Sequence, residues 1–218
     1  MKGFFLTIEG VDGAGKSSHM KRIAACFEAF DYEIVKTREP GGTPLAETLR
    51  ELLLSQDMSL ETELLLMFAA RQEHLNQVIK PALLSGKAVI CDRFSDSSFA
   101  YQGGGRQLAT EKIQSLVDLV HPDLQPDLTL LFDLPLEIAR ERMVRERQLD
   151  RFEREQEDFF ERVRAAFLAR AAAEPKRFVV IDSSRNKDEV SEFICQTISN
   201  RLQSHLLTIP SGMMEHHE

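Results

Sequence analysis

The sequence predicts an α/β fold in which a parallel sheet carries helices on both of its faces. Five short strand-like runs alternate with longer segments whose apolar residues recur at helical spacing, which is the order of elements found in such sheets. Two of the runs, residues 88–91 and 128–132, are nearly all apolar, as expected for strands that are covered on both sides. We therefore expect three layers, α/β/α, around five parallel strands.

The elements follow one another without a break that would divide the chain. No repeat, low-complexity block or linker rich in Gly, Pro or Ser interrupts them, so residues 1–209 are expected to form a single domain. Residues 210–218 show no periodic pattern and are expected to form a disordered tail. The expected strands are residues 4–8, 33–37, 88–91, 128–132 and 178–181. The expected helices are residues 17–29, 44–54, 61–84, 110–120, 136–146, 155–173 and 187–206.

The composition excludes some classes of function. No run of 18 apolar residues occurs, so no membrane span is expected, and a net charge of −8 disfavours a general nucleic-acid surface. The three cysteines, Cys26, Cys91 and Cys195, are odd in number, widely spaced and without a C-x-x-C pair. We expect them to be reduced apolar residues of a cytosolic protein.

A phosphate-binding loop joins the first strand to the first helix. Residues Gly10–Ser17 read GVDGAGKS and fit the pattern G-x-x-x-x-G-K-[ST]. Its glycines let backbone N–H groups turn toward a polyphosphate, Lys16 can reach the outer phosphates, and the Ser17 hydroxyl can hold Mg²⁺. Because an apolar strand precedes the loop and a helix follows it, we expect a P-loop NTPase-type fold that binds an anion at the helix N-terminus.

Charged residues follow the second and third strands, where parallel sheets bind ligands. The second strand leads into a tight REPGG turn, from which Arg38 could pair bidentately with a phosphate or remain a surface residue. The third strand ends at Asp92 and Arg93. An Asp in this place is typical of a carboxylate that acts on Mg²⁺ or its waters, and Arg93 could neutralise phosphate charge during transfer. A structural ion pair between these two residues is the alternative.

Two further segments could contact a nucleotide base. Residues Tyr101–Arg106 read YQGGGR; the glycines permit close backbone approach, and Gln102 offers both a donor and an acceptor to a base edge. The alternative is a flexible turn. In the helix at 61–84, Arg71 lies one turn from Met67 and Phe68, which predicts either a base-stacking pocket or ordinary core packing.

The most basic segment, residues 140–154, contains arginine and no lysine. Acidic residues are interleaved with Arg140, Arg142, Arg145, Arg147, Arg151 and Arg154. Planar groups with several donors suit phosphates, so we interpret the segment as a lid that closes over a nucleotide. A solvated helix stabilised by ion pairs is the alternative.

Taken in order, these motifs resemble those of the thymidylate kinases, and of the bacterial type with an Arg-rich lid in particular. The matching strings are EGVDGAGK ending at Lys16, REPGG from Arg38, FAAR ending at Arg71, DRF from Asp92, YQGGGR from Tyr101 and LDRFE from Leu149. The resemblance implies nucleoside-monophosphate kinase topology, transfer of the γ-phosphoryl group of MgATP to dTMP on the way to dTTP, a homodimer and a cytoplasmic location.

The resemblance also implies a role for each motif. Asp12 would reach the sugar 3′-hydroxyl, and Tyr101 would disfavour a 2′-hydroxyl. The implied ATP-binding residues are Gly10, Val11, Asp12, Gly13, Ala14, Gly15, Lys16, Ser17, Ser18, Arg140 and Arg185. The implied dTMP-binding residues are Asp12, Arg38, Met67, Phe68, Arg71, Arg93, Ser98, Tyr101 and Gln102, of which Arg71, Ser98 and Gln102 would read the thymine. Mg²⁺ would be held at Ser17 and Asp92, and the implied catalytic residues are Lys16, Asp92, Arg93, Arg145, Arg147 and Arg151.

Three points stay open. Gly13 stands where some family members carry an arginine, so the transition-state arginine would come from the lid, as Arg145, Arg147 or Arg151. Either Met67 or Phe68 would cover the base. The adenine site would lie between Arg140 and residues 183–186.

Two other functions compete with this interpretation. A P-loop kinase of another nucleoside monophosphate is disfavoured by the cluster of Ser98, Tyr101 and Gln102. A GTPase-like switch would need a D-x-x-G outside the phosphate loop and an N-K-x-D string. The chain offers only Asp12–Gly15 inside the loop, and the string NKDE from Asn186.

Overall fold

Five parallel strands form one sheet in the computed structural model, which describes residues 3–144, 151–152 and 155–207. The strands are β1 (Phe4–Glu9), β2 (Ile34–Arg38), β3 (Ala88–Asp92), β4 (Leu128–Asp133) and β5 (Phe178–Asp182). Their order in the sheet is β2-β3-β1-β4-β5, and every neighbouring pair is parallel. All five strands predicted from the sequence are confirmed, and each differs from its predicted bounds by at most one residue at either end.

The register of the sheet brings the ends of three strands together. Asp92 at the end of β3 pairs with Ile8 of β1 on one side and with Arg38 of β2 on the other. The segments that leave these strands therefore start from the same edge of the sheet, where parallel α/β proteins bind their ligands. This register, set by apolar pairing within the sheet, is what assembles residues far apart in the sequence.

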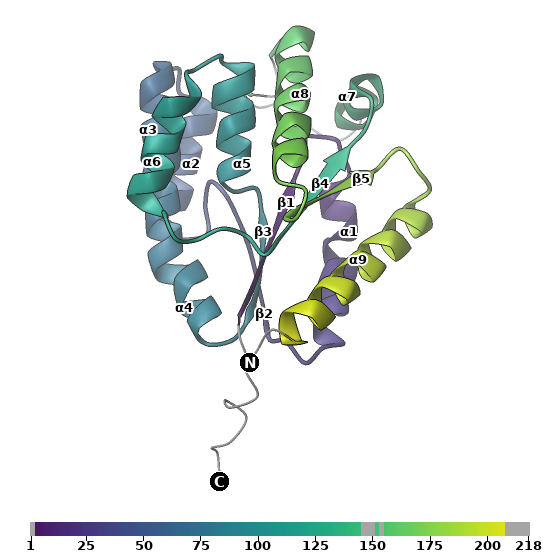
Figure 1. Cartoon of the computed structure of the whole chain (residues 1–218). Helices are drawn as coiled ribbons and strands as arrows, with labels where there is room; N and C mark the ends of the chain where they lie inside the picture. The colour runs from purple at the N-terminus through teal and green to yellow at the C-terminus, as the bar shows by residue number, and fades with distance from the viewer. Residues whose placement is uncertain (1–2, 145–150, 153–154, 208–218) are drawn as a thin grey trace.

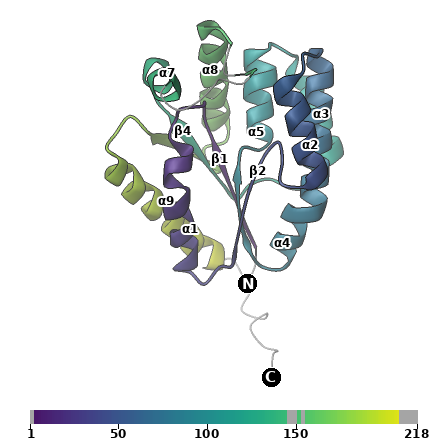
Figure 2. The same ribbon diagram turned by 180° about the vertical axis from the view of Figure 1, so that it is seen from behind.

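Helices cover both faces of the sheet (Figure 1). On one side lie α1 (Lys16–Glu28) and α9 (Lys187–Leu207), and on the other lie α3 (Leu60–His74), α4 (Lys80–Leu84) and α6 (Thr110–Val120), as the view from behind also shows (Figure 2). The remaining helices are α2 (Pro44–Ser55), α5 (Ser95–Ser98), α7 (Leu136–Val144) and α8 (Glu157–Ala173). The predicted helix at 61–84 is α3 and α4 joined by a π-helical turn, η1 (Leu75–Ile79).

Alternation along β1 divides the core between the two faces. Phe4, Leu6 and Ile8 belong to the apolar cluster that includes α1 and α9, whereas Phe5 belongs to the cluster that includes α3 and α6. All four side chains are fully buried. Successive strand residues point to opposite faces, so a strand that is apolar throughout requires a helix layer on each side.

The segment after β3 is helical, and sequence patterns did not predict this. α5 continues into the π-helical turn η2 (Phe99–Gly105), which contains all three glycines of YQGGGR. A Cβ atom on Gly104 would lie 2.6 Å from that of Ala166, and one on Gly105 would overlap the ring of Phe159. The glycines therefore permit close approach, as expected, but Gly104 and Gly105 approach α8, and Gly103 approaches Ile113 of α6. The alternative of a flexible turn is wrong.

The cysteines also differ from expectation. Cys26 of α1 and Cys195 of α9 are joined as a disulfide with Cα atoms 5.8 Å apart, whereas Cys91 is free and buried. The prediction of three reduced cysteines is therefore wrong for this pair. The two residues are 169 positions apart, and only the packing of α1 beside α9 brings them together. Among the described helices, none is long and apolar enough to cross a membrane.

Candidate active site

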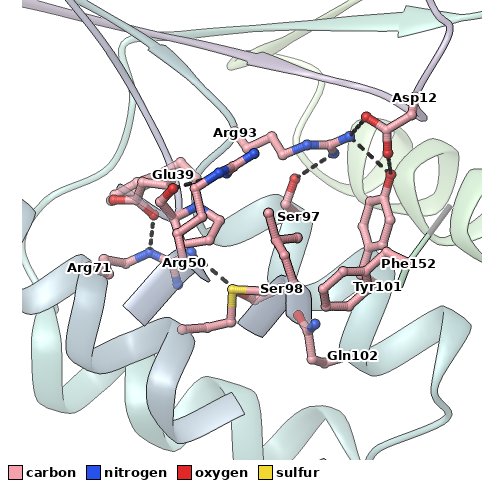
Figure 3. A pocket seen from close by; sticks show the side chains of 14 residues that line it. Asp12, Glu39, Arg50, Arg71, Arg93, Ser97, Ser98, Tyr101, Gln102 and Phe152 are labelled. Carbon is pink, nitrogen blue, oxygen red and sulfur yellow. Dashed lines mark hydrogen bonds and ion pairs between the residues drawn. The ribbon is translucent and has the colours of Figure 1, made fainter. Parts of the chain in front are cut away.

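Two adjoining cavities open at the carboxyl edge of the sheet. The first, here called the loop cavity, is lined by the phosphate-binding loop and the start of α1. The second, here called the Arg71 cavity, lies between α3 and the α5–η2 segment and is drawn in Figure 3. Asp12, Glu39, Arg50 and Arg93 line both cavities. A molecule in one cavity would therefore adjoin a molecule in the other at these four residues.

The start of α1 leaves backbone N–H groups available to an anion. Its N-cap residue is Gly15, in the left-handed conformation at φ 88°, and no side chain caps the helix. The first N–H groups of a helix have no partner within the helix, and the helix dipole makes this end favourable for negative charge. By contrast, α2 and α3 are capped by the hydroxyls of Thr43 and Ser59.

Lys16 is folded back onto the phosphate-binding loop. Its Nζ donates to the carbonyl oxygens of Gly10 and Val11, at 2.9 Å in each case. Burial is the main reason that the pKa of Lys16 is lowered, and the nearby Arg93 guanidinium adds to the effect. A Cβ atom on Gly10 would overlap the Phe132 carbonyl of β4, so the loop can lie against the sheet only with glycine at this position.

Asp92 lines the loop cavity and carries an unpaired oxygen among the described residues. Its Oδ1 atom is buried and has no hydrogen-bond partner among the described residues, and Ser17 lines the same cavity. A buried carboxylate oxygen without a partner is costly unless a cation or water satisfies it. A carboxylate and a hydroxyl are oxygen ligands of the kind that Mg²⁺ takes, so this donor set fits the ion.

A network of three side chains lies where the two cavities meet (Figure 3). Arg93 Nη2 donates to Asp12 Oδ1 at 2.7 Å and to the Tyr101 hydroxyl at 3.0 Å, and that hydroxyl donates to Asp12 Oδ2 at 3.1 Å. Burial opposes the ionisation of Asp12, but the charges of Arg93 and Lys16 outweigh it and hold the pKa of Asp12 well below its usual range. Asp12 is therefore an anion that fixes the Arg93 guanidinium.

Arg93 is also held by its backbone. Its φ is 69°, a left-handed conformation that is uncommon for a residue with a side chain. Its N–H donates to the Ile8 carbonyl at 2.9 Å, and its Nη1 donates to the Ser97 hydroxyl at 3.2 Å. Strain of this kind persists only where the surroundings impose it, and it concentrates at functional sites.

Arg71 forms the wall of the second cavity. Its Nε donates to Glu39 Oε2 at 2.7 Å and its Nη2 to the Ser98 hydroxyl at 3.2 Å, while its Nη1 is buried without a hydrogen-bond partner in the described part of the chain. The guanidinium stacks on the rings of Phe68 and Phe94. Glu39 is held in turn by His74, whose Nδ1 lies 3.0 Å from Glu39 Oε1. Arg71 is thus fixed, and its Nη1 group is left for a ligand.

Comparison with known proteins agrees with this geometry. The family model described as thymidylate kinase matches residues 8–194. The chain belongs to the thymidylate kinase family. It is 58% identical to the thymidylate kinase of Methylobacillus flagellatus over 190 residues, which cover 87% of this chain and 94% of that protein. It is 59% identical to that of Bordetella pertussis over 184 residues, which cover 84% and 88% of the two chains.

A solved structure supports the same family. The crystal structure of thymidylate kinase from Ehrlichia chaffeensis is 35% identical in sequence, covers 93% of this chain and 99% of its own, and superposes with a TM-score of 0.72. The predicted resemblance, the α/β fold class and the expectation of a kinase are therefore confirmed.

Most of the predicted site residues line one of the two cavities. Those in the loop cavity are Asp12, Gly13, Ala14, Gly15, Lys16, Ser17, Ser18, Arg38, Asp92, Arg93 and Arg185. Those in the Arg71 cavity are Asp12, Met67, Arg71, Arg93, Ser98, Tyr101 and Gln102. Met67 lines this cavity, whereas Phe68 is buried in the core beside Phe94 and His121. Of the two residues left open by the sequence, Met67 is therefore the one that faces this cavity.

Some predicted residues lie elsewhere. Arg38 pairs with Glu47 and lines the loop cavity but not the Arg71 cavity. Arg140 pairs with Glu157 at 2.7 Å and does not line the loop cavity, whereas Arg142 does, because residues two apart on a helix point in different directions. Arg142 Nη2 donates to the Ser183 carbonyl at 3.3 Å.

Arg151 also differs from expectation. It does not line the loop cavity; its Nη2 donates to Glu63 Oε2 at 2.6 Å and its Nε to the Leu53 carbonyl at 3.0 Å. The Glu63 carboxylate is fully buried, and a buried carboxylate needs a charged partner. Arg151 is such a partner, so its side chain lies against α3. Arg145 and Arg147, and the tail at 210–218, lie outside the described residues.

Sequence patterns did not indicate several residues of the site. These are Glu39, Arg50, Glu63, Ser97 and Phe152. Glu39 belongs to the REPGG turn, so its motif was noticed although its carboxylate was not. Glu63 had no local signal, because it occupies an ordinary helical position and its partners are distant in the sequence.

Proposed function

We propose that this chain transfers the γ-phosphoryl group of ATP to the phosphate of dTMP, giving dTDP and ADP. The observation that carries the proposal is the meeting of the two cavities at Asp12 and Arg93. The loop cavity has the residues that hold a polyphosphate, and the Arg71 cavity has polar groups suited to a base edge. Two substrates placed in these cavities would have their phosphates side by side, which is the arrangement that direct transfer requires.

In the proposed reaction, a phosphate oxygen of dTMP attacks the γ-phosphorus of ATP. The new O–P bond forms as the bond between the γ-phosphorus and the β–γ bridging oxygen breaks, and ADP leaves with that electron pair. The attacking oxygen is already anionic, so no residue needs to remove a proton from it. Catalysis then consists of positioning and of stabilising negative charge.

The cations of the site divide this task. Arg93, held by Asp12 and Ser97, is placed to neutralise the phosphates of both substrates. Lys16 would leave the loop carbonyls to which it now donates and bind the outer phosphates of ATP. Arg142 and Arg185 line the loop cavity, and we propose them as further partners of ATP.

The residues that would hold Mg²⁺ are Ser17 and Asp92, because the buried Asp92 Oδ1 has no other partner in the described structure. When bound with ATP, the ion would neutralise phosphate charge. The base-reading roles of Arg71, Ser98 and Gln102, and the covering role of Met67, remain proposals on the same footing. The single domain formed by residues 1–209 also remains a proposal.

A coupled assay of ADP release tests the function. MgATP is supplied with dTMP, dUMP, dCMP, dGMP, AMP, CMP or no acceptor. The proposal expects the fastest turnover with dTMP and weaker use of dUMP. Release without an acceptor would indicate a nucleoside triphosphatase, and a preference for another monophosphate would contradict the assignment of the Arg71 cavity to thymine.

We also propose that the chain forms a homodimer through the face of α2 and α3. Leu45 and Leu52, seven residues apart on one side of α2, are exposed, as is Leu65 on the neighbouring α3. Exposed apolar residues on adjacent helices are typical of an interface. Light scattering of the chain and of a Leu65→Lys variant tests this, and a monomeric wild-type mass would contradict it.

We propose a cytoplasmic location, as the family resemblance implies. The Cys26–Cys195 disulfide stands against it, because cytosolic thiols are generally kept reduced. Alkylation of thiols in intact cells distinguishes a cytoplasmic location from an oxidising compartment. In the cytoplasm, we expect Cys26 and Cys195 to be reduced and therefore alkylated. Neither cysteine lines either cavity.

A further inference from the structure

A fully buried carboxylate lies directly behind the Arg71 cavity. Glu63 of α3 has no exposed side-chain surface. Its Oε1 accepts from Gln102 Nε2 at 2.8 Å and its Oε2 from Arg151 Nη2 at 2.6 Å, and Arg106 Nη2 lies 3.8 Å away. Glu63 does not itself line either cavity. It therefore lies between two guanidinium groups.

The carboxylate determines which way the Gln102 amide faces. An ionised carboxylate can only accept hydrogen bonds, whereas an amide has one end that donates and one that accepts. Gln102 must therefore present Nε2 to Glu63. Its Oε1 accepts no hydrogen bond from the described residues, and Gln102 lines the Arg71 cavity, as Figure 3 shows. The carbonyl end is left for a ligand.

Gln102 and Arg71 together offer an acceptor and a donor. The donor is Arg71 Nη1, which is buried and has no hydrogen-bond partner among the described residues. Thymine and uracil present the complement, an N3–H donor beside an O4 acceptor. Cytosine presents an N3 acceptor beside an amino donor. Its acceptor would face the Gln102 carbonyl and its donor would face Arg71 Nη1, so neither pair could form a hydrogen bond. Mismatched buried polar groups discriminate strongly because they are left unpaired.

We propose that Glu63 is a positioning residue that sets the base preference of this site by fixing the Gln102 carbonyl toward the base. The inference rests on the proposed function, because it takes the Arg71 cavity as the acceptor site. Glu63 acts through Gln102 and does not touch substrate. Its ion pair with Arg151 also ties residue 151 to α3 beside the cavity.

The test is the Glu63→Gln variant, assayed with dTMP, dUMP and dCMP. A neutral amide at 63 can donate to Gln102 as well as accept from it, so Gln102 becomes free to turn its Nε2 toward the base. The ratio of kcat/KM for dTMP over dCMP should fall by about fivefold or more. The ratio for dTMP over dUMP should stay within about twofold, because these bases present the same edge.

Glu61→Gln is the matched control, since Glu61 lies on the same helix and pairs with Lys112 at the surface. It should leave both ratios unchanged. If Glu63→Gln does not fold, the Glu63→Gln/Arg151→Gln double variant replaces the ion pair by two neutral amides and leaves no unpaired charge; the same fall in the dTMP over dCMP ratio is expected.

The outcomes separate this inference from the proposed function. If the dTMP over dCMP ratio is unchanged in a folded variant, the inference is overturned. It is also overturned if the dTMP over dUMP ratio falls by the same factor, because that would indicate a general structural role. If the wild-type chain does not phosphorylate dTMP at all, the proposed function fails instead.

Discussion

The ion pair between Glu39 and Arg71 gives a prediction whose size follows from its burial. The side chains are 4% and 3% exposed, and the carboxylate accepts from Arg71 Nε at 2.7 Å with His74 Nδ1 at 3.0 Å on its other oxygen. Burial raises the cost of ionising Glu39, but the charge of Arg71 and the bond to His74 outweigh it and lower the pKa. Glu39 is therefore charged at neutral pH.

Substituting Glu39→Gln keeps the size of the side chain and removes its charge. Arg71 would then be a buried cation without a counter-charge, which typically costs about 3–5 kcal/mol in the free energy of unfolding. For a chain of this length, about 1 kcal/mol corresponds to a shift of about 2–4 °C, so the melting temperature should fall by about 6–20 °C. Calorimetry at pH 7 without nucleotide measures it.

A matched control lies eight residues later. Glu47 pairs with Arg38 at 2.8 Å, but the side chains are 39% and 55% exposed. Exposed pairs contribute about 0–1 kcal/mol, so Glu47→Gln should shift the melting temperature by less than about 4 °C. If Glu39→Gln were as stable as Glu47→Gln, the buried pair would not hold Arg71 in place, and the role of Glu39 in fixing the wall of the Arg71 cavity would be refuted.

Three further predictions concern the loop, the sugar and pH. Lys16→Ala should lower turnover by about 100-fold or more with the fold retained by circular dichroism; near-normal turnover would remove Lys16 from the phosphate site. Tyr101→Ala should relax discrimination against the ribonucleotide analogue of dTMP whereas Tyr101→Phe, which keeps the ring, should not; equal selectivity in the two variants would rule out the ring as the discriminator. Burial and the Asp96 charge raise the pKa of Glu9 to about 8, above its unfolded value of 4.5. The folded state therefore holds a proton that the unfolded state releases, and the free energy of unfolding should fall as pH rises from about 5 to 8. Denaturant unfolding across that range should show a weaker dependence for Glu9→Gln, and identical slopes would contradict the raised pKa.

The parts of the fold that local pattern encodes were predicted from the sequence. The strands at 88–91 and 128–132 stood out because a strand buried on both faces must be apolar throughout. The phosphate-binding loop stood out because its glycines and Lys16 act within eight consecutive residues. Family resemblance then extended the prediction to Arg71, Ser98, Tyr101 and Gln102, which the structure brings to one cavity. In each case the informative signal lay within a single short segment.

Tertiary structure alone decided which side chains meet across the molecule. Helical spacing placed both Met67 and Phe68 one turn from Arg71, and could not decide which of them faces the cavity. Only packing with Phe94 and His121 put Phe68 in the core and left Met67 at the cavity. Glu63 shows the limit most clearly, because Gln102 is 39 positions away and Arg151 is 88. The sequence by itself determined the sheet and the phosphate loop, whose chemistry is local. The partners of buried charges were decided by the tertiary structure, because a buried charge takes as its partner whichever opposite charge the packing of distant elements brings within reach.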